Sequence, residues 1–369
     1  KKKENFKLIR GSYTGKKIKD RNQSNVYKNI VLRSKKLLNR PISKILKARI
    51  YYTLGLNSRD FKKGKLTAPY LKRSLKLVDK NADLYKNIHV ELAEYYYNEK
   101  KYNAAIRHYN VILNLKKDSW FTKHLVNSAW CDFKLRKIGK GFEKTKTALR
   151  LGPKKSYYDN SSAALDALIV FSSHGKKIKE TLYFLKEEDR YYKFENYLKL
   201  AKFTSSQGLY SATNQVLVFL EKNKNKLFGK SNYAVGKILI FKLFFFDKFS
   251  KEKRFYKTLK SLNEEGYEYI DKENKVAVLE KMKEKALETQ KKIYIKKTAN
   301  KLIYLKKFKM LISSIIKVSP DLADEYFFYL GDVYYSMGKV TAAIESYKKS
   351  LKESIKRKIK NRRHKKFLK

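Results

Sequence analysis

The sequence has few of the residues that break helices or cross-link a chain. Its 369 residues include one cysteine, four prolines and 14 glycines. The single cysteine, Cys131, excludes an internal disulfide and a cysteine-based metal site. The scarcity of proline and glycine, with periodic stretches rich in Lys, Leu, Tyr, Ile and Ala, favours long helices over many short strands. We therefore expect an all-α protein.

Long uninterrupted hydrophobic runs are missing as well. A helix that spans a membrane needs about 20 apolar residues. The best candidate, residues 233–249, is interrupted by Lys237 and Lys242. The chain nevertheless has 43% hydrophobic and 14% aromatic residues, which is enough apolar surface to form a packed core.

Acidic residues are scarce relative to basic ones. Asp and Glu total 35 against 88 Lys and Arg, which gives a formal net charge of +53. Residues 1–50 hold 17 basic and two acidic residues, and residues 351–369 hold ten and one. This charge predicts affinity for polyanions such as acidic proteins, nucleic acid, an anionic membrane or an envelope polymer. The abundance of Lys, Asn, Ile and Tyr also matches the coding bias of an AT-rich genome, so charge alone does not identify the partner.

Recognisable motifs of catalysis and cofactor binding are absent from the sequence. It has no phosphate-binding loop, no GxGxxG after a strand and no GxSxG elbow. The histidines show no metal-ligand spacing; His89 and His108 would lie on opposite helices of one repeat, where a packed or solvent-facing pair is favoured over a ligand pair. We therefore expect no enzyme activity, no cofactor, no metal and no small-molecule substrate.

What the sequence does contain is an internal repeat, clearest at residues 324–351, DEYFFYLGDVYYSMGKVTAAIESYKKSL. With Asp324 as position 1, small Gly331 and Ala343 at positions 8 and 20 let two antiparallel helices approach closely. Gly338 at position 15 turns the chain between them. Larger side chains fill the space between the helices: Leu330, Tyr334 and Tyr347. Phe327 and Leu351 match positions 4 and 28 of the repeat.

Other segments repeat this spacing. Residues 86–113 match at six positions, another copy lies at residues 122–153, and a weaker copy starts at residue 194. Gly175 and Gly208 are predicted turn glycines, so residues 157–185 form another expected helical pair. Less regular helical pairs are predicted over residues 45–79 and 231–262. Residues 276–319 show long Lys-rich amphipathic stretches that indicate helix, but the small-residue positions of the repeat are not identifiable there.

This spacing resembles that of the tetratricopeptide repeat (TPR) family over about two thirds of the chain. The resemblance implies a right-handed α-solenoid of stacked antiparallel helix pairs. We divide the chain into four parts: a basic, partly disordered arm over residues 1–40, TPR-like repeats over 41–263, helical repeats over 264–351 ending in the clear copy, and a basic cap or tail over 352–369.

The resemblance also implies a binding groove. In this family the first helix of each pair lines a concave surface, mostly through positions 2, 5, 9, 12 and 13. Carried over, these positions predict a groove of mixed aromatic and basic character, without the Lys/Asn/Arg clamp by which chaperone-binding relatives hold an acidic peptide terminus. The predicted groove residues are Asn87, Val90, Glu94, Tyr97, Asn98, Lys123, Val126, Trp130, Phe133, Lys134, Lys202 and Ser205.

The leading hypothesis is a non-catalytic scaffold that binds a protein or peptide, preferably an acidic one, through this groove. The sequence starts at Lys1 without a methionine, and residues 120–149 loosely resemble repeat proteins of bacterial gliding-motility complexes. We therefore expect export and a role in a bacterial envelope or periplasmic assembly. Two alternatives stay open: a cytoplasmic nucleic-acid-binding repeat protein, supported by charge and by Tyr interleaved with Lys, and an adaptor at an anionic membrane surface, supported by the basic ends.

Overall fold

The computed structural model of the protein describes residues 22–60, 64–228, 232–265, 267, 270–295 and 298–367. All regular secondary structure within these residues is helical, which confirms the all-α prediction. The chain divides into two compact units between Tyr192 and Lys193. The domain boundaries inferred from the sequence at residues 40, 263 and 351 stay predictions.

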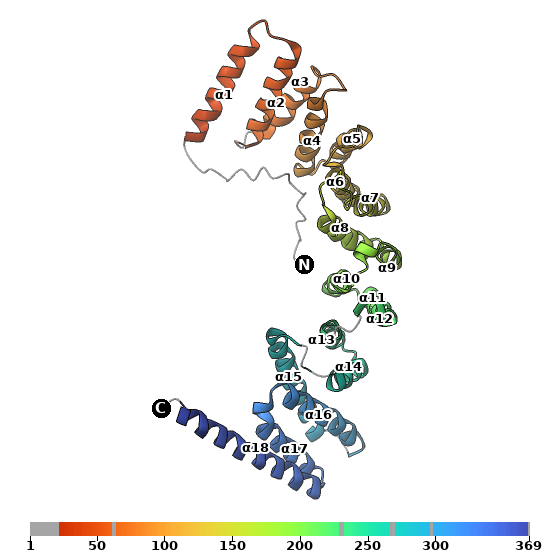
Figure 1. Cartoon of the computed structure of the whole chain (residues 1–369), viewed down its shortest axis with the longest axis vertical. Coiled ribbons are helices and arrows are strands. Elements are labelled where there is room, and N and C mark those ends of the chain that lie inside the picture. The colour runs from red at the N-terminus through yellow and green to blue at the C-terminus, as the bar shows by residue number, and fades with distance from the viewer. Residues whose placement is uncertain are drawn as a thin grey trace. The chain divides into compact units, whose positions relative to one another are not determined.

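The first unit is a succession of helices joined by short turns (Figure 1). Much of the predicted basic arm, residues 1–21, lies outside the described residues, and the rest of the arm, residues 22–40, contains the whole of the first helix. The helices are α1 (Asn22–Leu38), α2 (Lys44–Asp60), α3 (Thr67–Leu75), α4 (Asp83–Asn98), α5 (Tyr102–Asn114), α6 (Phe121–Lys134), α7 (Ile138–Leu151), α8 (Ser161–His174) and α9 (Ile178–Glu187).

The second unit continues the same pattern and ends in its longest helix. Residues 352–367, which the sequence predicts as a cap or a tail, extend that last helix without a break. The helices are α10 (Phe194–Ser206), α11 (Tyr210–Lys222), α12 (Lys224–Phe228), α13 (Asn232–Lys248), α14 (Glu252–Glu265), α15 (Lys272–Ile295), α16 (Thr298–Val318), α17 (Ala323–Ser336) and α18 (Val340–Phe367).

Within each unit, consecutive helices pack as pairs and successive pairs stack on one another. In the first unit, α4, α6 and α8 form one layer and α5, α7 and α9 form the other (Figure 1). This is the arrangement of an α-solenoid, in which each pair buries its apolar face against its neighbours. The predicted helical pairs over residues 45–79, 157–185 and 231–262 are therefore confirmed. Residues 276–319, for which the sequence indicates helix but no pair, contain most of α15 and all of α16, which pack against each other.

The turns within pairs share one backbone geometry wherever the left-handed conformation occurs in the described residues. In each turn one residue has a positive φ, and the amide of the next residue donates to the carbonyl five residues before it, as in a Schellman motif. These turn residues are Lys100, Arg136, Lys176, Gly208, Ser250 and Gly338, with φ between 53° and 76°.

The turn at residues 175–176 differs from the prediction. Gly175 was expected to supply the turn conformation, but its φ is −87°, and Lys176 takes the left-handed conformation instead, with φ 56°. Gly175 is required for its size, because a Cβ there would lie 2.9 Å from the Phe171 carbonyl oxygen and 3.0 Å from Ile138 Cγ2. It therefore lets the end of α8 approach the start of α7.

The small residues of the repeat lie where the helices of a pair meet. Ala93, Ala105, Ala129 and Ala201 are fully buried, and Ala343 is almost so. Most of the other repeat positions complete the interior of each pair, as the pattern predicts: Leu92, Tyr96, Tyr109, Ala148, Leu149, Tyr197, Leu200, Leu217, Leu330 and Tyr334 are all buried. In the last pair Phe327 and Tyr347 are half-buried, and Leu351 is 63% exposed. In the second unit, one hydrophobic core runs from α11 to α18.

Candidate partner-binding surfaces

The predicted groove residues differ widely in exposure. The structure leaves Asn87, Asn98, Lys134 and Lys202 exposed, while Val90, Glu94 and Phe133 are half-buried. The remaining five are buried, namely Tyr97, Lys123, Val126, Trp130 and Ser205. The five buried side chains offer almost no surface to a partner unless their neighbours move, and a binding role for any of the twelve stays a prediction.

Helix α6 explains most of this burial. Every residue from Phe121 to Asp132 is buried, because α6 packs against α5, α7 and α8 at once. The Trp130 ring meets the Phe171 ring of α8 edge-on at a centroid distance of 4.8 Å, and Phe133 stacks on Phe171 at 4.9 Å. The aromatic residues expected in an open groove therefore join neighbouring pairs together.

A charged groove residue, Lys123, also joins neighbouring helices. Lys123 Nζ of α6 lies 3.5 Å from Glu94 Oε1 of α4, and both side chains are largely buried. Beside them, Lys144 of α7 donates to Ser128 Oγ and to Asp132 Oδ2, each at 2.7 Å. A buried ion pair must offset the loss of hydration by good geometry. These contacts position the helices, and they leave Lys123 unavailable to an outside ligand.

The interior of the first unit also holds polar groups that sequence periodicity does not reveal. The Tyr97 hydroxyl is buried and makes no hydrogen bond. Burial raises the pKa of Tyr97, and it raises the pKa of the Cys131 thiol, beside Asp132, to about 12. Both groups therefore stay neutral, and the thiol has none of the thiolate character that a reactive cysteine needs.

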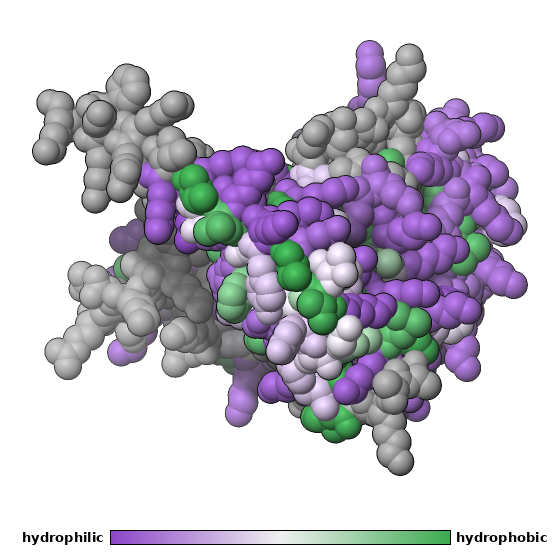
Figure 2. Space-filling model, turned by 90° about the horizontal axis from the view of Figure 1, so that it is seen from below, coloured by the Kyte–Doolittle hydropathy of each residue, from purple (hydrophilic) through white to green (hydrophobic). Residues whose placement is uncertain are grey.

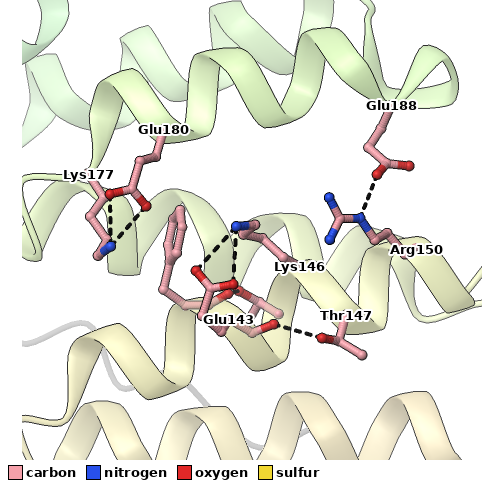
Figure 3. A network of polar contacts seen from close by, with 9 residues as sticks. Glu143, Lys146, Thr147, Arg150, Lys177, Glu180 and Glu188 are labelled. Atoms are coloured by element: carbon pink, nitrogen blue, oxygen red, sulfur yellow. Dashed lines mark hydrogen bonds and ion pairs between the residues drawn. The ribbon is translucent and has the colours of Figure 1, made fainter.

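The layer formed by α5, α7 and α9 carries a network of ion pairs (Figure 3). In α7, Lys146 Nζ pairs with Glu143 at 3.1 Å, and Arg150 Nε donates to Glu188 at 2.7 Å. The same two cations lie over the Phe184 ring of α9, at 5.7 and 5.2 Å from its centroid. Cation–π contacts and exposed ion pairs each contribute little, but together they tie α7 to α9.

The two histidines that the sequence places on opposite helices do approach each other. His89 Nδ1 of α4 and His108 Nδ1 of α5 are 3.0 Å apart, a hydrogen-bond distance. Within the described residues no group of three or more His, Cys, Asp and Glu side chains is placed to hold a metal ion. The pair therefore has the form of a packed hydrogen-bonded contact.

None of the helices that the structure describes combines the length and the apolar character needed to cross a bilayer. Lys242, which interrupts the most hydrophobic stretch, is buried and paired with Glu221 of α11. The apolar residues of α13 serve the core of the second unit.

Charge is distributed unevenly between the two kinds of helix. The first helices of the TPR-like pairs, α4, α6, α8, α10 and α17, together contain five Lys and Arg and nine Asp and Glu. The second helices, α5, α7, α9, α11 and α18, contain 19 and six. The positive charge of the repeats therefore lies on the second helices, above all on α18.

The stacked pairs, their small-residue contacts and their common turn define a TPR-like helical-repeat protein. No protein-family model matches the chain, and no curated protein matches it in sequence. The solved structures that resemble it include Pseudomonas aeruginosa PilF, with 16% identity, a TM-score of 0.34 and coverage of 60% of this chain and 92% of that chain.

Two further solved structures are similar over most of the chain. The structure of Naa15/Naa10 bound to HypK-THB has 10% identity and a TM-score of 0.40, and covers 90% of this chain and 63% of that chain. The chain therefore spans less than two thirds of that protein. The human IFIT1 dimer with m7Gppp-AAAA has 13% identity and a TM-score of 0.23, and the match covers 90% of this chain and 73% of that chain. These likenesses are too distant to bear on function.

Proposed function

We propose that the protein is a non-catalytic scaffold whose first helices bind a protein or peptide partner. The observation that supports this is the charge of those helices. Nucleic acid binds along a row of cations that neutralise its phosphates, and the five first helices α4, α6, α8, α10 and α17 contain fewer basic than acidic residues. A protein interface has no such requirement, because it combines polar and apolar contacts.

The exposed first-helix residues also indicate what such a partner would offer. In the first unit Asn87, Asn98 and Lys134 are exposed, and all three side chains present N–H donors. Their natural partners are carboxylates and backbone carbonyls, so we propose an acidic peptide segment as the ligand.

For the cellular setting, we propose a bacterial envelope or periplasmic assembly. The basic charge suits contact with anionic envelope polymers and membrane surfaces, and the loose resemblance of residues 120–149 to gliding-motility proteins points the same way. Fractionation of the source cells tests the setting. Recovery of the protein with the cytoplasmic proteins would overturn it.

Site-specific photo-crosslinking tests the binding proposal. A crosslinking residue replaces Lys134 on α6 in the full-length protein, and the matched control replaces Lys140 on α7, which is exposed but belongs to the second-helix layer. We expect a nuclease-resistant protein adduct from position 134 and none from position 140. Adducts that nuclease removes, or equal adducts from both positions, would refute the proposal.

A further inference from the structure

Helix α18 carries a row of exposed aliphatic side chains. Val340, Ile344, Leu351 and Ile355 expose 54%, 48%, 63% and 49% of their surface. At about 100° per residue, these four positions fall within an arc of about 60°, and they extend for about 22 Å along the helix. Viewed from the end that α17 and α18 form in Figure 1, hydrophobic residues make an oblique row bordered by hydrophilic ones (Figure 2). A single exposed aliphatic residue is ordinary, but an aligned row is not.

The apolar surface continues from α18 onto α17. Phe328 and Tyr335 are 50% and 68% exposed and lie seven residues apart, on one side of α17. The Phe328 ring lies 5.4 Å from the Tyr347 ring of α18, whose hydroxyl donates to Asp332 Oδ1 at 2.7 Å. We call this two-helix surface the end face, defined by Phe328, Tyr335, Val340, Ile344, Leu351 and Ile355.

An earlier pair of the same chain shows what normally covers such a row. In the repeat register, Val340, Ile344 and Leu351 occupy the same positions as Tyr102, Ile106 and Leu113 of α5. Helix α6 packs directly against α5, and the three α5 side chains are half-buried. In the last pair no described helix covers the corresponding row. The end face therefore has the form of a helix-docking surface that lacks its helix.

The two margins of the end face have opposite charge. Along α18 the nearest charged residues to the row are Lys348, Lys352 and Lys358, all exposed. Along α17 the margin carries Glu325 and Asp332. Both of these carboxylates accept a hydrogen bond from a tyrosine hydroxyl, Glu325 from Tyr329 at 3.2 Å and Asp332 from Tyr347.

We propose that the end face binds an amphipathic helix of a partner protein, apolar on one side and acidic along the edge that lies against α18. A second copy of this chain fits poorly, because α18 contains 11 basic and two acidic residues and would repel its own copy. An anionic bilayer fits poorly as well, because Glu325 and Asp332 would face its negative surface. This inference does not depend on ligand binding by the first helices α4 and α6.

A pair of synthetic peptides provides the direct test on the full-length protein. Each is an amphipathic helix of about 21 residues, long enough to cover the row, with Leu on one face. The first has Glu along one edge and the second has Lys there. Fluorescence anisotropy should show that the Glu peptide binds at least ten-fold more tightly than the Lys peptide. Equal binding of the two, or tighter binding of the Lys peptide, would overturn the proposal.

Substitutions then locate the binding site. We expect Leu351→Asn and Ile344→Asn each to weaken binding of the Glu peptide at least ten-fold. Leu287→Asn, which alters a 58% exposed leucine on α15, is the matched control and should leave binding unchanged. Because all three side chains are exposed, far-UV circular dichroism should be unaltered. Unchanged binding by both end-face variants would refute the assignment.

A second copy of the chain and a membrane are the alternative occupants of the end face, and each would give a different experimental result. Sedimentation that shows a dimer of the wild type, dissociated by Leu351→Asn, would assign the end face to a second copy. Binding to phosphatidylglycerol vesicles that Leu351→Asn abolishes would assign it to a membrane. Either result would overturn the proposal. A negative crosslinking result at Lys134 would leave it intact, because that experiment concerns the first unit.

Discussion

Gly141 of α7 faces the backbone carbonyl of Ala129 in α6 so closely that a Cβ at position 141 would lie 2.8 Å from that oxygen. The same Cβ would lie 3.3 Å from Phe171 Cε2 of α8. Backbone atoms cannot move aside without displacing a helix, so this contact sets how closely α6 and α7 approach. It is the physical reason for the small residue at this repeat position.

Gly141→Ala should therefore destabilise the protein, although alanine is the better helix former. We expect a loss of about 1–3 kcal/mol, which is typical of overpacking. Gly139→Ala, two residues earlier in the same helix, has open space around it and should be neutral or stabilising by up to about 1 kcal/mol. Urea unfolding measures both. Equal effects of the two substitutions would contradict this account of the α6–α7 contact.

Stability should fall as pH drops from about 7 to about 5. Burial, with the neighbouring His89 and Arg107, lowers the pKa of His108 to about 4, and burial lowers the pKa of His124 to about 4 and that of His89 below its ordinary value. Unfolded histidine titrates near 6.5, so below this pH the unfolded chain binds more protons than the folded chain. Stability is thus complete above pH 6.5 and declines until the folded pKa is reached.

The decline should approach about 1.4 kcal/mol per pH unit for each fully buried histidine. His124→Asn should flatten the curve of the urea midpoint against pH, whatever it does to stability at pH 8. A wild-type midpoint that is the same at pH 7 and pH 5 would show that these histidines are not buried in the neutral form.

Asp247 should connect α13 to α15 through its charge. Its carboxylate accepts from Lys285 Nζ at 2.8 Å and lies 3.1 Å from Lys281 Nζ. Burial alone would raise the pKa of Asp247, but the hydrogen bonds from the two lysines outweigh burial and hold it below its ordinary value. Asp247→Asn should cost about 1–3 kcal/mol. Glu280→Gln, at an exposed position of α15, is the control and should cost far less.

The contribution of Asp247 and its two lysines to stability should also depend on pH. A carboxyl whose folded pKa is depressed stabilises the protein above its unfolded value near 4, and the contribution is lost as pH falls through the folded pKa. The stability difference between wild type and Asp247→Asn should therefore persist at pH 5 and shrink below pH 4. A constant difference over this range would exclude a role for the charge.

Cys131 should resist thiol reagents in the native state. It is fully buried, and its raised pKa keeps it as the neutral thiol. Reaction with a chromogenic disulfide reagent should be slow in buffer and complete within seconds in about 6 M guanidinium, with one thiol released per chain. Because Cys131 is the only cysteine, its native rate reports opening of the first unit. Rapid native reaction would contradict its burial.

The helix pairs could be predicted from particular residues because helix periodicity and close packing are local requirements. Gly331, Ala343 and Gly338 are the residues that a tight two-helix hairpin needs, and the structure uses them in that way. The turns at Lys100, Arg136 and Lys176 were harder to predict, because the sequence does not mark a residue other than glycine that adopts the left-handed conformation.

The candidate groove could be predicted only in part. Position in the repeat indicates which residues lie on the first helices, but it does not indicate how closely successive pairs pack. Trp130 is buried because Phe171, 41 residues later, covers it. Lys123 can be buried because its ammonium group forms an ion pair with the Glu94 carboxylate. Such contacts join residues that no local pattern relates.

The sequence by itself determined the class of secondary structure, the repeat register and the excess of positive charge, since these depend on composition and on residues a few positions apart. The tertiary structure decided which first-helix residues remain exposed, brought His89 to His108, and left the row from Val340 to Ile355 uncovered. These outcomes depend on the packing of each pair against the next, where burial is a property of two surfaces and not of one segment.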